Sequence, residues 1–65
     1  MEENYSKEKI NALIEEWVHD ERNRKILYRK LIDNRTLDQL AEEFELSRRQ
    51  IANILKQGKR DIFSH

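Results

Sequence analysis

The chain has 65 residues, with 13 Lys and Arg against 13 Asp and Glu, and therefore carries no formal net charge. This length allows one small domain over residues 1–65 and is too short for a large internal active site. The absence of cysteine excludes disulfides and thiolate metal sites, and no apolar run approaches the roughly 18 residues that cross a membrane. With no proline and one glycine, the chain is predicted to be all-α. The missing cysteine fits a reducing cytosol, so a cytoplasmic location is expected.

Apolar residues recur at helical spacing near the start of the chain and predict a helix over about residues 7–18. Ser6 is its expected N-cap, and Tyr5 is placed to pack on the first turn as a hydrophobic staple. Trp17 continues the apolar face, so we expect it to lie in the core rather than to bind a partner. The full face consists of Ile10, Leu13, Ile14, Trp17 and Val18.

A second helix is predicted over about residues 21–32. Asp20 is a good N-cap for it, and Asn34 tolerates the left-handed conformation in which helices often end. This segment is basic, whereas the segments before and after it are acidic, so we expect its bases to pair with the first and third helices. The bases are Arg22, Arg24, Lys25, Arg29 and Lys30.

Two capping boxes predict the starts of a third and a fourth helix. Thr36 with Gln39 precedes a helix over residues 37–44, whose apolar face is Leu37, Leu40, Ala41 and Phe44. Ser47 with Gln50 precedes a helix that begins at residue 48, whose apolar face includes Ile51, Ile54 and Leu55.

The end of the fourth helix is open between two alternatives. Gly58 can end it as a C-cap, which gives a helix over residues 48–58. Alternatively the helix continues to residue 63, because Ile62 lies seven residues past Leu55 and on the same face. An internal glycine would then cost about 1 kcal/mol. Ile62 and Phe63 would either cover the bundle or form a contact in a homodimer.

The spacing of the last two helices predicts a helix-turn-helix over residues 36–58, within a compact four-helix domain. Only Glu45 and Leu46 separate Phe44 from the cap Ser47, so the turn is very short. Leu46 is apolar within this turn, and Ala41 is the small residue that a closely crossing helix needs. Two independent helices would require neither feature.

The string RTLDQLAEEFELSRRQIANILKQGKR resembles the helix-turn-helix of region four of bacterial sigma factors, and the preceding NRKILYRKLID resembles the helix that leads into it. The resemblance covers roughly residues 22–60 and implies that the fourth helix enters the major groove of DNA. Glu45 stands where many members have glycine, so we expect a wider or mildly strained turn. No segment resembles the other regions of a complete sigma factor, which points to a small region-four-like protein.

The basic residues of the fourth helix fit this role. From residue 46 to residue 60 there are five bases (Arg48, Arg49, Lys56, Lys59 and Arg60) and no acid. Arg binds guanine bidentately, and Asn and Gln bind adenine in the same way. The candidate base contacts are Arg48, Arg49, Gln50 and Asn53. The candidate contacts to the DNA backbone are Arg35, Thr36, Ser47, Lys56, Lys59 and Arg60.

These observations predict sequence-specific binding of duplex DNA by a small transcriptional regulator of bacterial or phage type. The alternative is a protein-interaction adapter, in which the basic fourth helix docks an acidic partner such as an RNA polymerase subunit. RNA binding ranks third, because no stacking aromatic residue lies on the exposed face. Catalysis has no support in the sequence. His19 has no second histidine or nucleophile nearby, and we expect neither a metal nor a cofactor.

Overall fold

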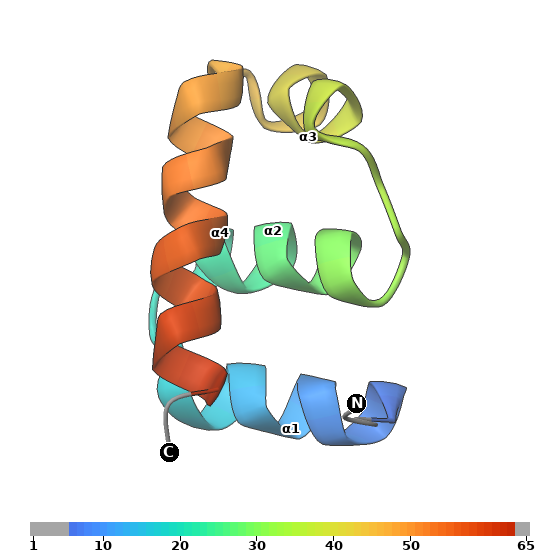
Figure 1. Ribbon diagram of the computed structural model, residues 1–65, viewed down its shortest axis with the longest axis vertical. Coiled ribbons are helices and arrows are strands. Elements are labelled where there is room, and N and C mark those ends of the chain that lie inside the picture. Colours follow the sequence, from blue (N-terminus) through green and yellow to red (C-terminus); the bar gives the residue numbers. More distant parts are fainter. Residues whose placement is uncertain (1–5, 64–65) are drawn as a thin grey trace.

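The computed structural model describes residues 6–63, which form four α-helices and no strand (Figure 1). The helices are α1 (Lys7–Trp17), α2 (Glu21–Leu31), α3 (Leu37–Phe44) and α4 (Arg48–Phe63). This confirms the predicted all-α, four-helix class. The staple predicted at Tyr5 lies outside the described residues. Over residues 6–63, no helix is both long enough and apolar enough to cross a membrane.

The helices begin at the predicted N-caps. The Ser6 hydroxyl accepts a hydrogen bond from the Lys9 backbone N–H at 3.1 Å, and the Asp20 carboxylate accepts one from the Asn23 backbone N–H at 3.0 Å. Thr36 and Ser47 each begin a capping box, with Gln39 and Gln50 as their reciprocal partners. Short polar side chains thus satisfy the backbone donors that a helix start leaves without partners.

The long helix α4 connects the others. Figure 1 shows α4 upright, with α3, α2 and α1 meeting it in turn along its length, and α4 contacts all three. The core between them is apolar. Its buried residues are Ile14, Val18, Ile26, Leu27, Leu40, Ile51, Leu55 and Ile62.

Trp17 does not lie in the core, so that prediction was wrong. Its side chain is 38% exposed, whereas Ile14 and Val18 are 2% and 6% exposed. These two residues stand four apart and occupy the inward positions of this segment. Trp17 is the last residue of α1 and lies on the flank of the same apolar face.

Gly58 lies inside α4 and is buried, so the C-cap alternative was wrong and the helix runs on to Phe63. A Cβ placed on Gly58 would lie only 2.7 Å and 2.9 Å from the Cδ2 and Cγ atoms of Leu27. Glycine therefore permits the close crossing of α2 and α4. Ile62, one turn further on, is 2% exposed and covers the bundle, while Phe63 is 38% exposed.

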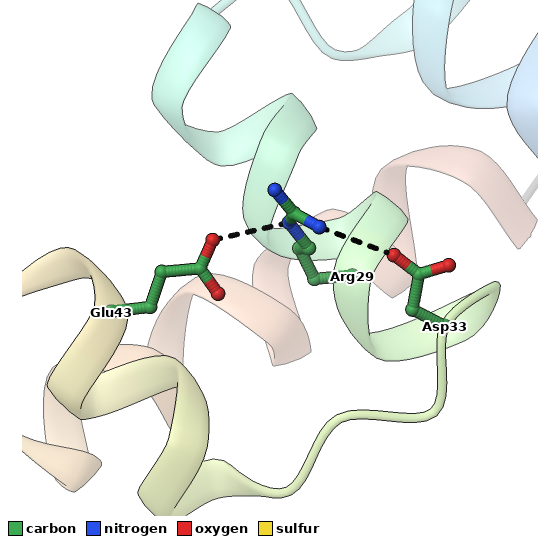
Figure 2. A network of polar contacts seen from close by, with 3 residues as sticks. All are labelled: Arg29, Asp33 and Glu43. Carbon is green, nitrogen blue, oxygen red and sulfur yellow. Dashed lines mark hydrogen bonds and ion pairs between the residues drawn. The ribbon is translucent and has the colours of Figure 1, made fainter.

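The basic segment on α2 has mixed partners. Arg29 forms an ion pair with Glu43 of α3 at 3.1 Å and donates a hydrogen bond to Asp33 at 3.5 Å. Figure 2 shows its guanidinium between the two carboxylates. The predicted pairing with the third helix is thus confirmed for Arg29. Arg24 reaches α1, but through backbone oxygens of Glu15 and Val18 and not through carboxylates.

Candidate nucleic-acid interface

The turn between α3 and α4 is closed by two backbone hydrogen bonds. The N–H groups of Glu45 and Leu46 both donate to the carbonyl oxygen of Ala41, the second at 3.0 Å. Glu45 has φ 56° and ψ 44°, the left-handed conformation of a Schellman-type helix end. The turn is therefore tight, and the absence of glycine produces local strain rather than a wider turn. Leu46 is half-buried and packs with Ala41 against the core.

The buried residues of α4 define its orientation. Ile51, Leu55, Gly58 and Ile62 are buried and follow the spacing i, i+4, i+7 and i+11. Four exposed residues repeat this spacing on the opposite side of the helix, since 100° per residue places each of them roughly opposite the buried face. We call them the outer stripe: Arg49, Asn53, Lys56 and Arg60.

The outer stripe holds no acid. Asp61 is the one acidic residue in the sequence of α4, and it lies half-buried beside the core face. Among residues 6–63, no ion pair occupies Arg49 or Lys56. The stripe therefore presents cationic side chains along more than three turns of helix.

Two of the four candidate base contacts have partners within the chain. Arg48 forms an ion pair with Asp38, in which its Nε lies 2.9 Å from Asp38 Oδ1. The Gln50 side-chain oxygen accepts from the Ser47 backbone N–H at 2.9 Å, which leaves the amide NH₂ of Gln50 as its available group. Arg49 and Asn53 are exposed on the outer stripe. The structure thus brings Arg49 and Asn53 together and sets Arg48 and Gln50 to the sides of the stripe.

The candidate contacts to the DNA backbone also divide into residues on the outer stripe and residues elsewhere. Lys56 and Arg60 belong to the outer stripe. Lys59 is exposed but stands about 100° around the helix from the outer stripe, in the row that begins at Arg48. Arg35 is exposed before α3, next to Thr36 at its start. The hydroxyls of Thr36 and Ser47 accept the backbone N–H groups of Gln39 and Gln50, both at 3.1 Å.

No sequence pattern marked Asp38 as part of this site. Asp38 contacts Arg48 across the turn, ten positions away, and no regular helical spacing predicts such a pair. Asp38 also lies in the first turn of α3, where an acid interacts favourably with the helix dipole.

A groove runs between α1, α2 and α3, and Tyr28, Phe44 and Lys25 are among its lining residues. Its lining mixes acids and bases, including Arg29, whose guanidinium is paired with Glu43. Over residues 6–63, no three side chains of His, Asp or Glu gather as metal ligands.

Comparisons of the chain with protein-family models, with curated proteins and with solved structures find no match. The resemblance to region four therefore rests on the residues themselves, and so does any function drawn from it.

Proposed function

We propose that α3, the turn and α4 form a helix-turn-helix that binds duplex DNA, and that the protein is a small cytoplasmic transcriptional regulator of bacterial or phage type. The outer stripe is the observation that carries this proposal. A rigid helix with a buried apolar face and an opposite cationic face is what the major groove accommodates. The tight turn, with its half-buried Leu46, holds this helix against the rest of the domain.

The proposed mechanism inserts the first half of α4 into the major groove. Arg49 and Asn53 are exposed one turn apart, so a guanine and an adenine near each other are natural targets for them. The Gln50 amide and the Arg48 guanidinium would meet base edges from the sides. Lys56, Lys59 and Arg60 follow along the same helix and would neutralise phosphates, which fixes the register without specifying sequence. Arg35, Thr36 and Ser47 would add phosphate contacts at the helix starts.

The region-four resemblance supports the same mechanism and suggests RNA polymerase as a protein partner. Two copies of the domain would bind a two-fold symmetric site, if the operator has that symmetry. Ile62 is buried inside the domain, so it does not belong to a surface for such a dimer.

Fluorescence anisotropy of a labelled duplex, titrated with the full chain at several salt concentrations, tests the proposal. Log affinity should fall linearly with log salt, with a slope of about 0.9 per neutralised phosphate. Lys56→Ala should reduce that slope by about one phosphate, and Arg49→Ala should weaken binding.

Lys25→Ala is the matched control, because Lys25 is an exposed base on α2 about 160° around the helix from Leu27, the residue that packs on Gly58 of α4. Its removal should leave the slope unchanged. If the wild-type chain does not bind duplex at low salt, DNA binding is wrong and a protein-interaction adapter becomes the better proposal. If Lys25→Ala and Lys56→Ala reduce the slope equally, α4 is not the binding helix.

A further inference from the structure

The ion pair between Asp38 and Arg48 lies at the end of α4 that the proposed function places in the groove. It links the first turn of α3 to the first residue of α4. Both side chains are largely exposed, at 74% for Asp38 and 69% for Arg48. In water such a pair contributes little to folding stability. Its location next to a candidate base contact suggests a different role.

The ion pair with Asp38 leaves the two terminal nitrogens of the Arg48 guanidinium accessible. Arginine carries five N–H groups in a rigid fork, and Nε is the guanidinium nitrogen that lies 2.9 Å from the Asp38 carboxylate. The two terminal nitrogens of Arg48 therefore remain available as a pair of donors. Guanine presents two acceptors, N7 and O6, on its major-groove edge, and a bidentate arginine satisfies both.

We propose that Asp38 is a positioning residue that fixes the base preference of Arg48 for guanine. This inference rests on the proposed function. A free arginine side chain samples many rotamers and loses that freedom on binding. Asp38 holds Nε before DNA arrives, so the terminal nitrogens already face one direction. Exclusion of water from the groove then strengthens the ion pair that orients them.

Arg49 provides an internal comparison. It is exposed on the outer stripe, and among residues 6–63 no carboxylate holds its guanidinium. Arg49 can therefore adapt to a phosphate or to several base edges. We expect the position read by Arg48 to be more strictly guanine than the position read by Arg49.

Binding-site selection from randomised duplexes tests the inference with the full chain. The wild type should enrich a site that contains an invariant guanine, and both Arg48→Ala and Asp38→Asn should lose the preference at that position. Anisotropy with duplexes that differ only there should give about a 5- to 150-fold preference for guanine in the wild type. In both variants this ratio should fall towards one. Glu42→Gln, which removes another exposed acid of α3, should keep the preference.

The possible outcomes separate the inference from the function on which it rests. If Asp38→Asn retains the guanine preference that Arg48→Ala loses, Asp38 does not position Arg48, although DNA binding stands. If Arg48→Ala keeps the full preference, the inference is also wrong. If the wild type binds no duplex at all, the proposed function fails first. Circular dichroism confirms that each variant is folded, and Asp38→Ser is used in the same way if Asp38→Asn unfolds.

Discussion

Glu45 bears the backbone strain of the turn between α3 and α4. Its φ of 56° costs a residue with a Cβ about 1–2 kcal/mol, whereas glycine adopts this conformation freely. Glycine also increases the entropy of the unfolded chain, which offsets part of the stability gained by relieving this strain. Glu45→Gly is therefore expected to raise the free energy of unfolding by about 0.5–1 kcal/mol.

Urea denaturation followed by circular dichroism measures this change. Glu45→Ala is the control, because it removes the charge and keeps the Cβ, and it should give no such gain. A loss of stability in Glu45→Gly would show that the glutamate side chain contributes a stabilising contact that outweighs its strain.

The Arg24 side chain caps the C-terminal end of α1. Its guanidinium donates to the backbone oxygens of Val18 and Glu15, the latter at 2.7 Å. Carbonyl groups in the last turn of a helix have no partner within the helix and carry partial negative charge, so an arginine there is stabilising. Arg24→Gln should lower the free energy of unfolding by about 1–2 kcal/mol.

The neighbouring variant Lys25→Gln should change stability by less than about 0.5 kcal/mol, because Lys25 is exposed. Thermal and urea unfolding of the two variants side by side measure the difference. Equal effects would contradict a capping role for Arg24 and would point to the charge of the segment instead.

At the scale of whole helices, the crossing of α2 over α4 depends on the missing side chain of Gly58. An alanine in the middle of a helix is normally better than glycine by about 1 kcal/mol. Here its Cβ would lie within 3 Å of three atoms of Leu27, so the helices would have to move apart. Gly58→Ala is expected to destabilise the domain by about 1–3 kcal/mol despite its better helix propensity.

Gln57→Ala, at the exposed position next to Gly58, is the matched control and should leave stability nearly unchanged. Denaturant titrations of the two variants and the wild type give the comparison. A stabilised Gly58→Ala would mean that Leu27 repacks without cost and that the crossing does not require glycine.

These helices also show how far sequence reasoning extends. Capping signals and apolar spacing are local, so they predicted every helix start and placed the helix ends to within a residue or left two alternatives. The end of α4 was ambiguous because the role of Gly58 depends on Leu27, which is thirty-one residues away in the chain. For the same reason, neither the pair of Asp38 with Arg48 nor the cap formed by Arg24 was predictable. Contacts between elements carry no local pattern.

At the scale of the molecule, the zero net charge conceals a separation of charges. The sequence of α4 contains five bases and one acid, and that of α3 contains three acids and no base. Which residues of α4 are exposed was predictable, because the apolar face of the helix determines which residues point outward. Which of these exposed residues contact another part of the chain was not predictable, since that depends on the neighbouring α3 and on the cap at Ser47.

Binding to DNA should stabilise the folded domain as a whole, because a ligand that binds only the folded state shifts the folding equilibrium. At a duplex concentration of about 100 Kd this contributes about 2.7 kcal/mol. For a domain of this size the melting temperature should rise by about 10–20 °C. Differential scanning fluorimetry or calorimetry at low salt measures the shift.

The double variant Arg49→Ala/Lys56→Ala should show a much smaller shift at the same duplex concentration, although its melting temperature without DNA should match the wild type. Both residues are exposed, so their removal leaves the core intact, and under the proposed function it removes contacts to DNA. A wild-type shift that high salt does not reduce would contradict binding through phosphates. Equal melting-temperature shifts in the wild type and the double variant would show that the outer stripe is not the binding surface. The basic residues of α2 would then be the next candidate.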